Sequence, residues 1–196
     1  MDSYEVHIFT DASELAYGAV AYLKLTYIDG SSSRSFIMGK SRLAPVKSVS
    51  LPRLELNAAV VGVRIAKILK KEMTLPITSF RYWTDSTLVL QYITDKSHRF
   101  KEYVANRVTE ILELTNACDW RHKDGKLNPA DICSRGIMDP CNLLKKDNHS
   151  KSWIFGPEFL NGENTASTEV IWQELDENDP EIKKKDILVA ANFKQQ

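Results

Sequence analysis

The 196-residue sequence is poor in cysteine, glycine and proline, with 3, 8 and 7 residues of each. Its cysteines, Cys118, Cys133 and Cys141, are odd in number and form no Cys-x-x-Cys pair, which favours reduced thiols over a disulfide framework. This composition excludes a collagen, a coiled-coil rod and a fully disordered chain. With 43% hydrophobic residues, the chain is long enough for one compact domain with its own core and not clearly for two.

A long apolar run and a net charge are also missing. No run approaches the ~18 residues of a membrane span, and the N-terminal segment MDSYEVHIFT alternates apolar and polar residues, unlike a signal peptide. We therefore expect a soluble, unexported protein that has no membrane partner. Residues 1–136 carry 19 Lys and Arg against 15 Asp and Glu, whereas residues 137–196 carry 7 against 11. The zero net charge is thus a cancellation, and the mildly basic part is compatible with a nucleic-acid partner.

Alternating apolar and polar residues predict β-strands in the first forty residues. We expect strands over residues 4–10, 17–28 and 35–41, with Asp29-Gly30-Ser31 as a hairpin turn, so that three antiparallel strands precede any helix. Further along the chain, residues 79–84 and 118–121 have the composition of two more strands.

A long helix is predicted over the segment that follows Pro52 and ends before Pro76. Its apolar residues repeat at helical spacing at Leu54, Ala58, Val61, Ile65 and Ile68. Shorter helices are expected over 86–92, 100–115 and 129–135, the last of them closed by Gly136. Three strands, a long helix and then alternating strands and helices predict an α/β fold with a five-stranded mixed sheet flanked by helices.

Beyond Gly136 the composition changes, and we divide the chain there. Residues 1–136 are predicted to form the main domain, and residues 137–160 an ordered C-terminal extension, because Trp153, Ile154, Phe155 and Phe159 need a surface to pack on. Residues 161–196 are predicted to be an acidic or polar tail or linker.

Four acidic residues fall at corresponding ends of the predicted elements. Asp11 and Asp85 follow the first and fourth strands, Glu55 lies in the first turn of the long helix, and Asp131 starts the last helix. Ligands of open α/β sheets collect at the carboxyl ends of the strands. If the first and fourth strands are parallel neighbours, the acids meet at that edge.

Crowded carboxylates raise one another's pKa, and a divalent cation resolves the conflict. Oxygen ligands favour Mg²⁺ or Mn²⁺, and two such ions can activate a water and stabilise the leaving oxygen of a phosphodiester. The set therefore predicts phosphodiester hydrolysis. Each acid alone has an ordinary interpretation, as a turn or helix cap, a helix-dipole partner or a solvated side chain.

The segments FTDAS, LPRLELNAA, YWTDS and NPADICSRG resemble, in order and spacing, the four catalytic motifs of a type 1 ribonuclease H. More closely, the chain is similar to the ribonuclease H region of BEL/Pao retrotransposon polyproteins, which is sometimes catalogued as a Pao retrotransposon peptidase. The likeness runs from about residue 4 to 160 and includes KSRLAPVKSVSLPRLEL, FKEYVANRVTEI and SWIFGPEFL. It implies a ribonuclease H-like fold and cleavage of the RNA strand of an RNA–DNA hybrid during reverse transcription.

The resemblance also implies roles for individual residues. Asp11 would bridge two Mg²⁺ or Mn²⁺ ions, Glu55 and Asp85 would hold one of them, and Asp131 would help to hold the other. Candidate contacts to nucleic acid are short polar and basic side chains near the acids and in the segment DKSHRFKEY, namely Ser13, Arg53, Asn57, Ser86, Lys96, Arg99 and Lys101. Capping and ordinary helix surface are equally good interpretations of the short polar ones. Reverse transcriptase and integrase segments of the same polyprotein are the expected partners, in a cytoplasmic retrotransposon particle or the nucleus.

The sequence alone assigns no catalytic role to any of the histidines. His122 lies nine residues before Asp131, where many relatives carry a histidine that assists proton transfer or product release, but the resemblance to retrotransposon versions leaves its catalytic role undecided. His7, in the first strand, is predicted to be structural, and His98 to belong to a basic handle or a solvated turn. Cys133, Cys141 and His149 fit no common zinc spacing.

Three other functions compete with a hybrid ribonuclease. An aspartic peptidase needs paired Asp-Ser/Thr-Gly loops, and FTDAS and WTDST have no glycine at the third place. An integrase of the same fold takes its glutamate from a late helix, whereas Glu55 lies early in the long central one. A catalytically silent or domesticated module that only binds nucleic acid or a polyprotein neighbour remains an alternative, although all four acids are present.

Overall fold

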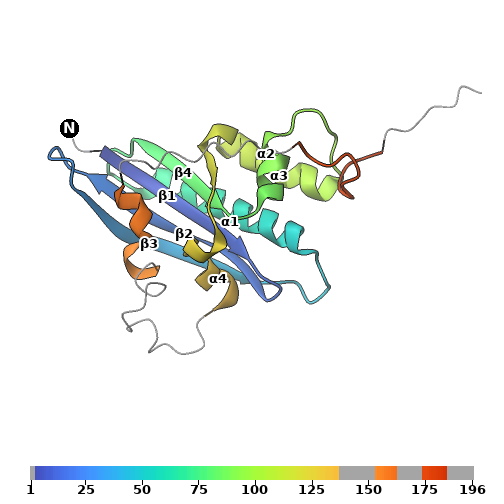
Figure 1. Ribbon diagram of the computed structural model, residues 1–196, viewed down its shortest axis with the longest axis horizontal. Coiled ribbons are helices and arrows are strands. Elements are labelled where there is room, and N and C mark those ends of the chain that lie inside the picture. The colour runs from blue at the N-terminus through green and yellow to red at the C-terminus, as the bar shows by residue number, and fades with distance from the viewer. Residues whose placement is uncertain (1–2, 137–152, 163–173, 185–196) are drawn as a thin grey trace, which may run out of the picture.

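A five-stranded mixed sheet forms the centre of the computed structural model, which describes residues 3–136, 153–162 and 174–184 (Figure 1). Its strands are β1 (Ser3–Ala12), β2 (Ala16–Thr26), β3 (Ser32–Leu43), β4 (Ser79–Thr84) and β5 (Trp120–His122). They lie in the order β3-β2-β1-β4-β5; β1, β2 and β3 pair antiparallel, while β4 pairs parallel with both β1 and β5. The prediction of a five-stranded mixed sheet that begins with three antiparallel strands is confirmed.

Four α-helices accompany the sheet in the described residues: α1 (Leu51–Glu72), α2 (Thr87–Thr94), α3 (Glu102–Leu114) and α4 (Asp131–Arg135). Short 3-10 turns are η1 (Ala117–Asp119), η2 (Gly125–Leu127) and η4 (Glu158–Asn161). Pro52 lies in the first turn of α1 as predicted. The helix ends before Pro76, where the N–H of Met73 donates to the carbonyl oxygen of Leu69.

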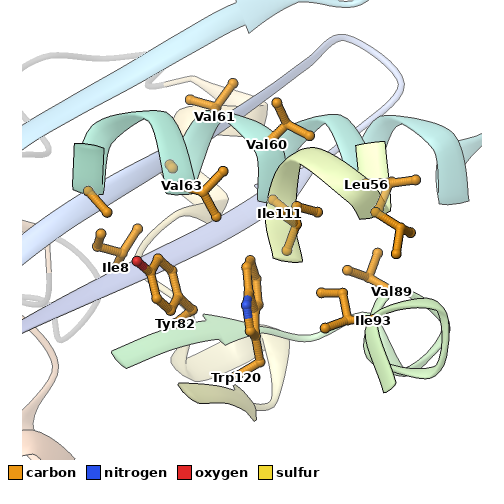
Figure 2. Close-up of a cluster of buried hydrophobic side chains, with 14 of the residues drawn as sticks. Ile8, Leu56, Val60, Val61, Val63, Tyr82, Val89, Ile93, Ile111 and Trp120 are labelled. Atoms are coloured by element: carbon orange, nitrogen blue, oxygen red, sulfur yellow. The ribbon is translucent and has the colours of Figure 1, made fainter. Parts of the chain in front are cut away.

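One side of the sheet packs against α1, α2 and α3 through the main hydrophobic core (Figure 2). Val60, Val61 and Val63 project from α1, and the rings of Tyr82 and Trp120 stack with their centroids 4.9 Å apart. Of the five apolar positions predicted to face the core from α1, four are buried, but Ile68 is 44% exposed. The buried stripe continues through Leu69 instead, because a period of 3.6 residues moves the stripe around the helix.

The other side of the sheet packs against α4 and residues 153–162. Phe9 contacts the rings of Trp83 and Phe159, and Leu160 is completely buried. The Tyr22 hydroxyl donates to the carbonyl oxygen of Trp153 at 2.7 Å. Because both faces are covered, β1 is buried along most of its length, and its alternating sequence does not mean that one face meets water.

Two details of the predicted C-terminal parts differ from the expectation. Trp153 and Phe159 pack as expected, but Ile154 and Phe155 are 37% and 59% exposed. Residues 174–184, within the predicted tail, lie against the domain: Ile182 pairs with Phe100 in an isolated antiparallel bridge, and Leu175 is buried in the main core. Residues 137–152, 163–173 and 185–196 lie outside the described residues, so the three-part division of the chain stays a prediction.

The described parts of the chain contain no disulfide and no candidate membrane span. Cys118 is exposed and Cys133 is buried, both as free thiols, while Cys141 and His149 lie outside the described residues. No described helix combines the length and the apolar composition that crossing a membrane needs.

Close packing of α1 on the sheet depends on Gly62. A Cβ at this position would lie 2.7 Å from Cγ2 of Thr10, a short branched side chain that cannot swing away. The substitution Gly62→Ala should therefore lower the free energy of unfolding by about 1–2 kcal/mol, because overpacking outweighs the gain in helix propensity. Urea unfolding measures the change.

Gly162→Ala is the matched control, since the same added methyl group would meet its nearest neighbour at 3.6 Å. A Gly62→Ala protein as stable as this control would contradict the packing account.

Candidate active site

The parallel pairing of β1 with β4 brings two of the predicted acids to one edge of the sheet. Thr10 and Thr84 are the last paired residues of the two strands, and Asp11 and Asp85 come directly after them. The Asp11 side chain is buried, with 7% of the residue exposed, and Asp85 is half-buried. Two carboxylates from adjacent parallel strands therefore lie side by side at the carboxyl end of the sheet.

Glu55 and Asp131 join this edge from different helices. The Ser86 hydroxyl, which caps α2, donates to Oε2 of Glu55 and so links α1 to the end of β4. Glu55 is the fifth residue of α1, one position beyond the first turn that the sequence predicted. Asp131 begins α4 as expected.

Residues of α4 and the loop before it fix the end of β1. The Ser134 hydroxyl donates to Oδ2 of Asp11, and Arg135 forms an ion pair with Asp131. Asn128, which is almost completely buried, donates from Nδ2 to the carbonyl oxygen of Thr10 at 2.9 Å and accepts from the N–H of Ala130 at 3.1 Å. The loop and α4 are thereby held at the end of β1.

Gly125 lies against the second acid. A Cβ at this position would stand 2.7 Å from Oδ2 of Asp85, so an added methyl group would force the carboxylate to shift. Gly125, Asn128, Ser134 and Arg135 were not among the predicted site residues, although all four lie in the segment HKDGKLNPADICSRG. Ser134 and Arg135 are three and four residues after Asp131, and this helical spacing was the signal that they lie on the same side of the helix as Asp131.

The four carboxyl groups are electrostatically coupled. The pKa of Asp11 is raised to about 7, mainly by burial; the charges of Asp85 and Asp131 also raise it, and the hydrogen bond from Ser134 lowers it. Burial also raises the pKa of Glu55, with a contribution from Asp11. The pKa of Asp85 is raised by burial and by Glu55 and Asp131, against a hydrogen bond with the Asp11 side chain. The four acids therefore lie within electrostatic reach of one another, and their roles stay a prediction.

This arrangement suits a hard cation by its chemistry, because all the converging donors are carboxylate oxygens. As placed, however, the carboxylates point to Ser134, Ser86 and Arg135 as well as to one another. Within residues 3–136, 153–162 and 174–184, no group of three or more His, Cys, Asp or Glu side chains is arranged to hold a metal ion.

Three histidines have defined places. Nε2 of His122 lies 3.1 Å from the carbonyl oxygen of Asp85, and because a carbonyl only accepts, this nitrogen carries the proton. His7 is completely buried and accepts at Nδ1 from the Trp83 indole at 3.1 Å, while burial lowers its pKa, which agrees with a structural role. His98 contacts Asp95 in the loop between α2 and α3.

The predicted nucleic-acid contacts divide into two kinds. Ser13, Ser86 and Asn57 already have protein partners: Ser13 donates to the carbonyl oxygen of Ser134, Ser86 caps α2, and Asn57 accepts from α3. Lys96, Arg99 and Lys101 are exposed together on the loop between α2 and α3. Arg53 forms an ion pair with Glu181. Binding of nucleic acid by any of them stays a prediction.

Comparison with a family model supports the resemblance seen in the sequence. Residues 1–86 match the model described as "Pao retrotransposon-like RNaseH-like domain". The matched segment includes Asp11, Glu55 and Asp85 and ends before Asp131. No curated protein matches the chain.

Several solved ribonuclease H structures are similar to this chain. The N-terminal RNase H domain of Rv2228c from Mycobacterium tuberculosis, solved as a fusion with maltose binding protein, matches at 16% identity and a TM-score of 0.45, covering 71% of this chain and 97% of its own. RNase H1 from Halobacterium salinarum matches at 14% identity and a TM-score of 0.44, covering 68% of this chain and 95% of its own. LC11-RNase H1, whose structure is a complex with an RNA/DNA hybrid, matches at 11% identity and a TM-score of 0.45, covering 71% of this chain and 99% of its own.

Coupling among the acids predicts a specific pH dependence of stability. Asp11 has a pKa of about 7 in the folded protein and the ordinary value of 3.8 in the unfolded chain, so the folded state binds this proton more tightly. The contribution of Asp11 to the free energy of unfolding should therefore fall as the pH rises from about 4 to about 7 and stay low above that. Urea unfolding in EDTA at a series of pH values measures it.

Asp11→Asn removes the titration while keeping an acceptor for Ser134. Above pH 7 the variant should exceed the wild type in stability by up to about 4 kcal/mol, and the difference should vanish near pH 4. The exposed Asp29→Asn serves as the control. Parallel pH profiles for wild type and Asp11→Asn would show that Asp11 is an ordinary carboxylate.

Proposed function

We propose that this chain is a metal-dependent endonuclease that hydrolyses the RNA strand of an RNA–DNA hybrid. One observation carries the proposal: Asp11, Glu55, Asp85 and Asp131 come from four separate elements to one edge of the sheet, where burial and mutual repulsion raise the pKa of three of them. A protein that needed these residues only for stability would not be expected to gather four acids in a partly buried place.

The family match and the structure support the proposal from different parts of the chain. Asp11, Glu55 and Asp85 lie inside the segment that matches the Pao retrotransposon-like RNaseH-like domain. Asp131 lies outside it, and α4 brings it to the same edge, where its charge acts on Asp11 and Asp85. Asp131 is thus included in the proposed site because of its position in the structure and not because of the family model.

In this proposal the four acids would hold two divalent cations, Mg²⁺ or Mn²⁺. The chemistry supplied by such ions is activation of a water and stabilisation of the leaving oxygen of the phosphodiester. The residues around the acids have positioning roles: Ser134 orients Asp11, Ser86 orients Glu55, and Gly125 lets the backbone approach Asp85. Without a cation, burial and the neighbouring acids raise the pKa of Asp11 and Asp85, and a bound cation would oppose that rise.

His122 is placed to act near Asp85 but not as a base through Nε2. That nitrogen donates to the Asp85 carbonyl oxygen, so a role in proton transfer or product release requires the imidazole to turn or to use Nδ1. The biological setting we propose is reverse transcription of a retrotransposon, next to polymerase and integrase segments of the polyprotein, in a cytoplasmic particle or the nucleus.

Cleavage of a labelled hybrid tests the proposed function. With Mg²⁺ or Mn²⁺ the full chain should cut the RNA strand of an RNA–DNA hybrid internally and spare single-stranded RNA and duplex DNA, and EDTA should abolish cutting. A hybrid that stays intact with both ions would reject the enzyme. Hybrid binding without cleavage would favour the silent nucleic-acid-binding module.

Asp85→Asn tests the site itself. Loss of one carboxylate should lower the cleavage rate by at least about a hundredfold, because the variant loses an ionised ligand at the reacting centre, while hybrid binding is kept. Asp29→Asn, which removes a fully exposed acid between β2 and β3, should cut at the wild-type rate. Equal rates for Asp85→Asn and Asp29→Asn would remove Asp85 from the proposed metal site.

A further inference from the structure

Arg53 is the centre of a polar cluster between α1 and α3. Its guanidinium group lies 4.5 Å from the centre of the Tyr103 ring, and the guanidinium group of Arg107 lies 3.4 Å from the same ring centre. Asn57 accepts hydrogen bonds from the Tyr103 hydroxyl and from Nε of Arg107. We call Arg53, Asn57, Tyr103 and Arg107 the arginine cluster. Stacking on one ring and a shared amide acceptor hold the two guanidinium groups in fixed orientations.

A carboxylate occupies this cluster with the geometry of a bound oxyanion. Nε and Nη2 of Arg53 donate to Oε1 and Oε2 of Glu181 at 2.6 and 3.0 Å. Two parallel N–H···O bonds to two oxygens of one planar or tetrahedral anion are the arrangement in which arginine binds phosphate as well as carboxylate. Glu181 is 128 residues away in the chain, and its side chain is 10% exposed.

Glu181 belongs to an acidic strap, which we define as residues 174–184 (Figure 1). The strap contains five acidic residues and two lysines. Its backbone is bonded to the loop between α2 and α3: the N–H of Lys101 donates to the Glu181 carbonyl oxygen and the N–H of Lys183 to that of Arg99, both at 2.7 Å. The Tyr92 hydroxyl donates to the Asp179 carboxylate at 3.1 and 3.2 Å.

The strap therefore lies on the surface that we predicted to contact nucleic acid. Arg53 is one of those residues, and the loop to which the strap is bonded contains the three exposed basic ones, Lys96, Arg99 and Lys101. Arg53 is two residues before Glu55, about 3 Å along the axis of α1. The two side chains do not share a face of the helix: Arg53 contacts Tyr103 and the strap, whereas Glu55 contacts Ser86.

We propose that the arginine cluster is a binding site for a backbone phosphate of the RNA–DNA hybrid, and that Glu181 of the acidic strap occupies it when no substrate is bound. The inference rests on the proposed function and adds to it a substrate contact and an internal competitor. The exchange is energetically feasible because the Arg53 side chain is 35% exposed, and ion pairs at such positions contribute little stability. A polyanion that also reaches the neighbouring lysines can replace one carboxylate.

Hybrid affinity of matched variants tests the inference. All chains carry Asp85→Asn so that the hybrid stays intact, and a fluorescent hybrid is titrated at several salt concentrations. Glu181→Gln should bind about five to ten times more tightly than Glu177→Gln, because releasing Arg53 adds one phosphate contact. Both variants remove one negative charge from the strap, but Glu177 is exposed, so it controls for net charge.

Salt dependence and a double variant make the test specific to Arg53. The slope of log affinity against log salt should become steeper by about 1 in Glu181→Gln, as expected for one more phosphate contact. Arg53→Gln should weaken binding, and adding Glu181→Gln to it should restore nothing. Thermal unfolding of each variant verifies that the fold is kept.

Equal affinities for Glu181→Gln and Glu177→Gln would overturn the inference and leave the Arg53–Glu181 pair as a contact that only stabilises the fold.

Cleavage by the same variants with Asp85 intact separates this result from failure of the proposed function. Tighter binding by Glu181→Gln without cleavage by any chain would reject the enzyme and keep the phosphate site. Cleavage with equal affinities would keep the enzyme and reject the site, and no binding by any chain would reject both.

Discussion

Parallel pairing of β1 with β4 is the constraint on which the site depends. Because Thr10 and Thr84 are the last residues that pair between these two strands, the residues that follow them in the chain lie at the same level at this edge of the sheet. Both of these residues are aspartates. Burial of β1 on both faces then fixes the strand that carries Asp11, and the positions of Glu55 and Asp131 follow from how α1 and α4 pack on its two sides.

This placement has an energetic cost that the fold offsets locally. Gathering acids in a partly buried region raises their pKa and favours protonated over ionised forms. Hydroxyl donors on Asp11 and Glu55 and the guanidinium group of Arg135 beside Asp131 each relieve part of that cost. Loss of stability at a cluster of charged side chains is common at functional sites, which agrees with the proposed function.

Charge is also arranged over longer distances. The mildly basic domain presents Lys96, Arg99 and Lys101 on one loop, and the acidic strap is bonded to that same loop. The cancellation of charge between the two parts of the sequence thus has a local counterpart in space. If this surface binds a polyanion as we propose, the acidic segment that covers it would favour exchange over permanent occupancy.

The succession of strands and helices along the chain, the long helix and the four acids could be predicted from the sequence because each depends on local signals. Alternation marked β1 and β2, helical spacing marked α1, and the acids stood at the ends of the predicted elements. Local signals were less reliable near element ends: Ile68 is exposed, and Glu55 lies beyond the first turn. Ile154 and Phe155 were expected to pack because of their composition, which does not say which side of a short segment faces the domain.

Other features depend on residues far apart in the chain. The bond from Ser134 to Asp11 spans 123 residues, and the pair between Arg53 and Glu181 spans 128. No periodicity or local motif encodes such contacts, because they arise only when separate elements pack together. The sequence by itself determined the kinds of element and the presence of four acids. Only the tertiary structure decided that these acids share one edge of the sheet and that an acidic segment lies on the basic surface beside them, since both follow from packing between distant residues.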